Sequence, residues 1–165
     1  MSAINIIIRP RESMTWTEFC AKTPPCSIAL DGMVRGGPKW DETTLHVNFD
    51  HHECVVREAT MSTAMQVYFA IKAGLLKRFN GQVHVWVNDP DQDTALACWL
   101  LQHHKQFAGM QSHPVVSRIL TLTDRWDITG GAFPMSLDEQ IVRQYSWVFS
   151  PYTELRKSGE LARAG

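Results

Sequence analysis

Short apolar runs alternate along this chain with longer segments whose apolar residues recur at helical spacing. The runs are typical of buried strands, and Pro10 ends the first of them because proline cannot donate to a strand ladder. Strands are expected at 4–8, 27–30, 45–49 and 82–87. Helices are expected at 15–22, 62–77, 94–106, 114–123 and 137–149, with a loop at 33–43. Alternation of this kind predicts an α/β fold, in which a largely parallel β-sheet is flanked by helices in three Rossmann-like layers.

Polar residues mark the expected starts of three of these helices. Ser62 is a plausible N-cap for the segment that follows it, and Asp93 or Thr94 could cap the next one. Ser136 and Glu139 have the spacing of a capping box.

The length of 165 residues fits one domain with a core of its own. We expect residues 1–150 to form a single α/β domain and 151–165 to be a polar C-terminal helix or tail. No run of about 18 apolar residues is present, and the N-terminus lacks the pattern of a signal peptide, so we expect a cytoplasmic protein without a membrane partner. The four cysteines are scattered, which favours reduced thiols.

The net charge of −1 provides no basic field to hold a long nucleic acid. It still allows a short oligonucleotide or a small phosphorylated compound as the partner.

Three of the expected strands end in acidic residues: Asp31, then Asp50 with His51 and His52, then the segment 89–93 with its three aspartates. If these strands are parallel neighbours, their carboxyl ends share one edge of the sheet, where ligands bind in open α/β folds. So many carboxylates in one crevice would repel one another, and divalent ions would relieve that repulsion. Two ions about 4 Å apart are a common device for phosphoryl hydrolysis.

Each of these features also has a simpler interpretation. Asp31 before a glycine is most often part of a turn, and Asp50 or Asp91 could simply cap the segment that follows. The pair His103–His104 lies late in an expected helix, where positive charge suits the helix dipole. His46 and His84 lie within expected strands and are interpreted as packing residues.

The combination of acid-ended strands with the tripeptide Asp50-His51-His52 resembles the DHH phosphoesterase superfamily. The tripeptide Asp50-His51-His52, followed by a helix that begins near Ser62, is similar to the signature motif of that superfamily. The segment 88–97 is similar to its acid-rich first metal motif, Asp31 is placed like its second motif, and Asp124 is a weaker match to its fourth. The likeness covers residues about 27–130.

The resemblance implies a hydrolase that depends on one or two Mn²⁺ or Mg²⁺ ions and acts on a small phosphorylated compound, a short oligonucleotide or a cyclic nucleotide. The implied metal ligands are Asp31, Asp50, His51, Asp91, Asp93 and Asp124. The implied catalytic residues are Asp50, His51 and His52. The residues expected to bind substrate are His52, Arg57 and Asn88, and a homodimer is compatible with this interpretation.

The chain departs from the pattern of the family in three ways. The acid-rich motif follows the DHH tripeptide instead of preceding it, Val87 stands where that motif normally has a histidine, and the chain has little room for the second, substrate-binding domain. These departures motivate an alternative function: a catalytically degenerate DHH-like domain that binds a nucleotide, a metal or another protein.

Overall fold

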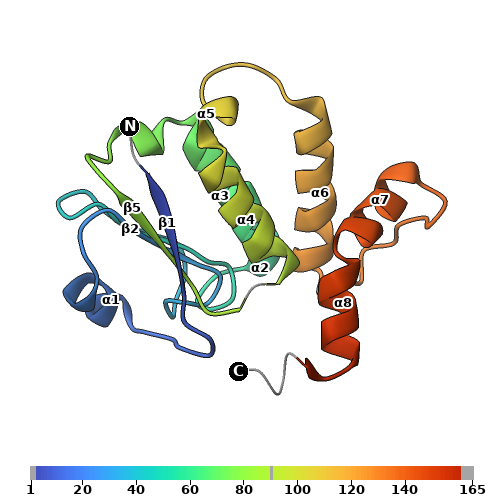
Figure 1. Cartoon of the computed structure of the whole chain (residues 1–165), viewed down its shortest axis with the longest axis horizontal. Coiled ribbons are helices and arrows are strands. Elements are labelled where there is room, and N and C mark those ends of the chain that lie inside the picture. Colours follow the sequence, from blue (N-terminus) through green and yellow to red (C-terminus); the bar gives the residue numbers. More distant parts are fainter. Residues whose placement is uncertain (1–2, 90, 161–165) are drawn as a thin grey trace.

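The computed structural model describes residues 3–89 and 91–160, and its strands form one five-stranded sheet (Figure 1). The strands are β1 (Ile4–Ile8), β2 (Ser27–Leu30), β3 (Lys39–Asp41), β4 (His46–Phe49) and β5 (Val83–Val87). Their spatial order is β1-β5-β2-β4-β3. Strands β1, β5, β2 and β4 are parallel, and β3 pairs antiparallel with β4 at one edge. The expected α/β fold with a largely parallel sheet is therefore confirmed.

Helices cover both faces of this sheet (Figure 1). Helix α1 (Trp16–Lys22) packs on one face, and α3 (Thr63–Lys72) and α4 (Gln92–Gln102) pack side by side on the other. Helix α6 (Pro114–Ile128) lies against α3 and α4, and α7 (Gln140–Val148) and α8 (Ser150–Lys157) follow beyond it. The short helices are α2 (Arg57–Thr60), η1 (Leu75–Lys77) and α5 (His104–Phe107).

Strand β5 shows how the sequence divides the two faces. Val83, Val85 and Val87 are buried in the large core that includes α3 and α4. Trp86 points to the opposite face and joins the smaller core around Phe19 of α1. The central strand β2 is buried at every position, as a strand covered by helices on both faces must be.

The structure corrects several expected boundaries. The expected loop at 33–43 contains β3, a three-residue strand whose hydrogen-bonding partner is the later strand β4. The expected helix 62–77 is interrupted at Gly74, which has φ of 86° in the left-handed region. The expected helix 114–123 continues for more than a turn, to Ile128. This extension places Asp124 and Asp127 within the helix.

The helix starts also differ in part from expectation. Ser62 caps α3 as expected, since its side chain accepts from the amide of Met65. Helix α4 is capped by Asp91, so the expectation of Asp93 or Thr94 was wrong by about one half-turn. The expected capping box of Ser136 and Glu139 does not form, because α7 has no side-chain cap.

The cysteines of this chain are all unpaired, in agreement with the expectation. Among the helices of residues 3–89 and 91–160, none has the length and apolar character needed to cross a lipid bilayer.

Candidate metal site

The carboxyl ends of β2 and β4 bring two acidic residues together. These strands are parallel neighbours, and the amide of Asp31 donates to the carbonyl of Phe49, 2.9 Å away, which extends the pairing past the end of β2. Nδ1 of His52 lies 2.8 Å from Oδ1 of Asp50 and 3.5 Å from Oδ1 of Asp31. Asp31 and Asp50 therefore lie at the same edge of the sheet, as the sequence predicts.

His51 lies at the centre of the acidic residues and is fully buried. Its Nε2 atom lies 2.8 Å from Oδ2 of Asp127 and 3.5 Å from Oδ1 of Asp31. Two sets of possible metal ligands include it: Asp31 with His51 and His52, and His51 with Asp93 and Asp127. Within each set the ligand atoms lie within 4.8 Å of one another.

The hydrogen bonding of these residues fits a metal site. Within the described part of the chain, Nδ1 of His51 and Oδ2 of Asp50 have no hydrogen-bond partner, and Nε2 of His51 and Oδ2 of Asp127 lie 2.8 Å apart without the geometry of a hydrogen bond. Buried polar atoms without partners are costly, and a bound cation is one of the few groups that satisfies a nitrogen and carboxylate oxygens together. Two atoms that each lie about 2.1 Å from one ion are about 3 Å apart, which is close to the separation of His51 from Asp127. These buried aspartate and histidine side chains could therefore hold a metal ion.

Two threonines and the start of α3 fix the carboxylates in place. Thr63 and Thr94 donate their hydroxyl groups to the two oxygens of Asp31, each over 2.9 Å. The oxygens of Asp93 accept from the amides of Thr63 and Ala64, over 2.6 Å and 3.0 Å. Each oxygen keeps a second lone pair, so these contacts orient the carboxylates and leave them able to bind a cation.

Three of the expected metal ligands lie outside both sets. Oδ1 of Asp50 accepts from the amides of His51 and His52 and thereby shapes the turn after β4. Asp91 caps α4 through the amide of Thr94. Asp124 accepts from the amide of Ser62 over 2.7 Å, so it supports the start of α3. The carboxylate of α6 that belongs to a set of possible ligands is that of Asp127, not that of Asp124.

The crowding of charge shifts the pKa values in opposite directions. Burial, together with the nearby charge of Asp31, raises the pKa of Asp91 to about 6 and raises the pKa of Asp93 well above its usual value. Burial alone would lower the pKa of His51, but contacts with Asp127 and Asp31 outweigh it and raise that pKa to about 10. With this raised pKa, His51 carries a positive charge at neutral pH beside Asp31 and Asp127, and Arg57 adds a second one beside Asp127.

The pKa values of His52 and Asp31 are also shifted by their neighbours in this cluster. The hydrogen bond with Asp50 raises the pKa of His52, although partial burial opposes it. Burial would raise the pKa of Asp31, but the contacts with His51 and His52 and the hydrogen bond from Thr94 together lower it.

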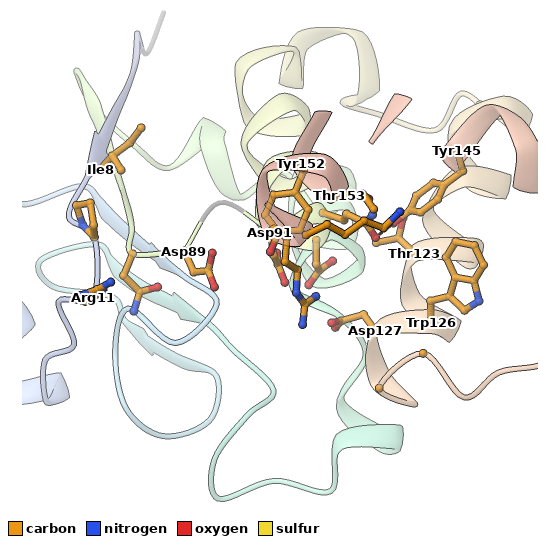
Figure 2. A pocket seen from close by; sticks show the side chains of 18 of the residues that line it. Ile8, Arg11, Asp89, Asp91, Thr123, Trp126, Asp127, Tyr145, Tyr152 and Thr153 are labelled. Carbon is orange, nitrogen blue, oxygen red and sulfur yellow. Dashed lines mark hydrogen bonds between the residues drawn. The ribbon is translucent and has the colours of Figure 1, made fainter. Parts of the chain in front are cut away.

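The candidate metal site opens into a cleft of about 1300 Å³. Figure 2 shows Asp91 and Asp127 on its floor, with Tyr152 of α8 above Asp91 and Trp126 and Tyr145 to one side. Arg57 and Asn88, which were expected to bind substrate, both line the cleft. Nη2 of Arg57 lies 3.3 Å from Oδ1 of Asp127, while the amide nitrogen of Asn88 donates to the carbonyls of Glu12 and Gly32.

Sequence reasoning missed Asp127, Thr63 and Thr94. Asp127 lies three residues after Asp124, so a longer helix 114–128 would have placed both carboxylates on one face. The two threonines are small residues in the first turns of α3 and α4, and only the adjacency of these helices shows that both reach Asp31.

His46, His103 and His104 lie outside both sets of possible ligands, in agreement with the expectation that they are structural residues. His46 is buried between the hydroxyl groups of Thr23 and Thr44, which lie 3.0 Å and 2.6 Å from its ring nitrogens. His103 and His104 lie near backbone carbonyls at the end of α4.

Comparison of the chain with protein-family models, curated proteins and solved structures finds no match.

Proposed function

We propose that this protein is a divalent-metal-dependent phosphoesterase that hydrolyses a small phosphorylated compound, a short oligonucleotide or a cyclic nucleotide. The observation that carries the proposal is the buried His51, which belongs to both sets of possible ligands and whose ring nitrogens make no hydrogen bond of good geometry among residues 3–89 and 91–160. Mixed carboxylate and imidazole ligands at an open cleft suit Mn²⁺, and carboxylates also suit Mg²⁺. The resemblance to the DHH superfamily supports the same activity.

In this proposal Asp31, His51, His52, Asp93 and Asp127 hold one or two ions at the carboxyl edge of the sheet. A bound divalent ion supplies an activated water and polarises a phosphoryl oxygen. The side chain of His52 is 39% exposed and belongs to the first set of possible ligands, so it could contact either an ion or a phosphate oxygen from solvent.

Arg57 is the residue best placed to bind the phosphate itself. Its guanidinium group lines the cleft beside Asp127, and its Nε atom is buried without a hydrogen-bond partner in the described part of the chain. Guanidinium groups bind phosphate through paired, charge-assisted hydrogen bonds. Arg57 would therefore orient the phosphoryl group over the ligands of the metal.

The activity is tested by hydrolysis of bis(p-nitrophenyl) phosphate and of pyrophosphate with Mn²⁺ or Mg²⁺. The variant Asp127→Asn keeps the size of the side chain but removes a charged ligand, and we expect kcat/KM to fall by about 100-fold. The matched control is Asp138→Asn, an exposed aspartate that lies outside the cleft. Equal activity in all three proteins, or no activity in any, would contradict the proposal.

One observation favours a second candidate function, a metal- or nucleotide-binding module without catalysis. Val87 stands where the family motif has a histidine, and it is 2% exposed and packed in the core, so it cannot supply a ligand. For this alternative, Mn²⁺ should raise the free energy of unfolding by about 2.7 kcal/mol at a hundredfold excess over Kd, without turnover. Chemical unfolding with Mn²⁺ and with a chelator, run beside the hydrolysis assay, separates the two functions.

A further inference from the structure

Helix α8 presents one face to the cleft. Tyr152, Thr153, Arg156 and Lys157 line the cleft, and their spacing places them on neighbouring turns of the same side of the helix. Asp91, Asp93 and Asp127 line the same cleft, and Tyr152 lies above Asp91, so this face of α8 is turned toward the acidic floor (Figure 2). Residues 151–157, expected to belong to a polar helix or tail, therefore form a wall of the cleft, and the last residues of that expected segment, 161–165, lie outside the described part of the chain.

The two cations on this wall are not neutralised by the acids of the floor. Within the described ranges, neither Arg156 nor Lys157 forms an ion pair with Asp91, Asp93 or Asp127. Lys157 lies 3.4 Å from Glu154, but both side chains are largely exposed, so this pair contributes little and does not hold the lysine. The cleft thus has an acidic floor that suits cations and a separate basic wall that suits an anion.

The dimensions and the aromatic residues of the cleft indicate a ligand larger than one phosphate group. Its volume of about 1300 Å³ exceeds the roughly 300–1000 Å³ of common small-molecule sites. Tyr152 lines the cleft from the α8 wall and Trp126 from one side of the floor, and both rings are half-buried, whereas Tyr145 is 4% exposed and packs against Trp126 (Figure 2). The half-buried rings of Trp126 and Tyr152 can stack on a planar part of the ligand.

We propose that α8 is a binding platform for a second anionic group of the substrate, and that Arg156 and Lys157 bind a phosphate other than the one that is hydrolysed. This inference rests on the proposed function, because it places the hydrolysed phosphoryl group at the candidate metal site on the acidic floor of the cleft. It adds the substrate class: a compound with two phosphates separated by a spacer that crosses the cleft beside Trp126 and Tyr152.

The test uses a matched pair of chromogenic substrates with the full chain and Mn²⁺. One is the p-nitrophenyl ester of thymidine 5′-phosphate, and the other is the same ester with an additional phosphate on the 3′-oxygen. We expect kcat/KM to be at least about tenfold higher for the second, since charge-assisted hydrogen bonds to a phosphate are worth that much or more. In the double variant Arg156→Gln/Lys157→Gln the preference should disappear, while the ester without the extra phosphate is hydrolysed at the original rate.

The control is Arg118→Gln/Lys105→Gln, which removes the same two charges from exposed positions outside the cleft. This control variant should keep the higher kcat/KM for the ester that carries the 3′-phosphate. The variant Arg156→Lys should keep part of that difference. A preference that is absent from the original protein, or that survives the loss of Arg156 and Lys157, overturns the inference.

Binding measurements separate this inference from the proposed function. Equilibrium binding of thymidine 3′,5′-bisphosphate and of thymidine 5′-phosphate is measured with Mn²⁺ in the same proteins. Tighter binding of the bisphosphate that depends on Arg156 and Lys157, in a protein that hydrolyses neither ester, would support the platform and contradict the phosphoesterase. Hydrolysis of the esters together with equal binding of both ligands would support the phosphoesterase and contradict the binding platform on α8.

Discussion

At the scale of single residues, the buried imidazole of His51 decides whether the acidic residues can coexist. It lies 2.8 Å from Asp127 and 3.5 Å from Asp31, and its pKa is raised to about 10 although burial opposes the charge. In the absence of metal, the positive charge of the protonated His51 ring helps to balance the negative charges of the neighbouring carboxylates. Removing it leaves the buried carboxylate of Asp31 with hydrogen bonds from two threonines but without this adjacent positive charge, which is more costly than losing an exposed ion pair.

The variant His51→Gln should therefore be much less stable than His52→Gln. We expect a loss of about 3 kcal/mol in the free energy of unfolding for His51→Gln at pH 7 with a chelator present. The loss for His52→Gln should stay below about 1 kcal/mol, because the side chain of His52 is 39% exposed. Urea unfolding of both variants measures this difference. Equal losses would mean that His51 is not the balancing charge.

The residues that directly follow strands were the predictable part of the site. Asp31, Asp50 and His51 come straight after apolar runs, and parallel strands bring such positions to one edge. Asp127 was not predictable in the same way, because its place depends on how far a helix continues and on how that helix packs. Whether Asp91 and Asp124 reach a metal or cap a helix also depends on geometry that the local sequence does not contain.

At the scale of elements, the start of α3 is hydrogen-bonded to acidic residues of the candidate metal site and of helix α6. Asp124 and Asp93 together accept the amides of Ser62, Thr63 and Ala64, which are donors that the helix itself cannot satisfy. Negative charge at this end also suits the helix dipole. Asp124 and Asp127 lie three residues apart on α6 but make different contacts. Asp124 accepts from the amide of Ser62, and Asp127 lies beside His51.

A pair of variants on α6 should separate the roles of these two residues. Asp124→Ala leaves the buried amide of Ser62 without a partner and should lower the free energy of unfolding by about 2 kcal/mol. The activity per folded molecule should stay within a few-fold of the original. Asp127→Asn should lose about 100-fold in activity with less than about 1 kcal/mol of stability, because its carboxylate is partly exposed. Urea unfolding and the Mn²⁺-dependent assay measure the two quantities, and a reversed pattern would contradict these roles.

The elements with strong local signals were predicted well. The short apolar runs became β1, β2, β4 and β5, and Ser62 caps α3 as expected. Strand β3 was missed because three residues carry almost no periodicity and are held by pairing with a later strand. The end of α6 was missed because its last turn is polar in composition, with burial supplied by α7.

At the scale of the whole molecule, the pKa shifts give the stability a particular dependence on pH. A carboxyl group whose pKa is raised on folding contributes a loss of stability as pH rises from its unfolded pKa to its folded pKa, here from about 4 to about 6 for Asp91. His51 stabilises fully below its unfolded pKa near 6.5, and this contribution is lost as pH rises through about 10. Asp31, whose pKa is lowered, acts in the opposite sense only below about pH 4.

Without metal, the stability contributed by Asp91 and His51 should therefore decline from about pH 4 to about pH 10. Mn²⁺ should reverse the trend, because it binds deprotonated ligands and competes with protons. Melting temperatures measured from pH 5 to pH 9 should show a small effect of Mn²⁺ at pH 5 and a large one at neutral to alkaline pH. Curves with metal and with chelator that remain parallel across this range would indicate acids that act only as separate helix caps.

The bonds from Thr63 and Ala64 to Asp93 also give the protein an internal signal of occupancy. Both amides share their acceptor with the candidate metal site, so a cation that draws electron density from Asp93 weakens both hydrogen bonds at once. Their proton resonances should move upfield and their exchange with deuterium should become faster as a diamagnetic ion such as Mg²⁺ is added. The first turn of α3 would thus report whether the metal is bound, in a sample that contains no substrate.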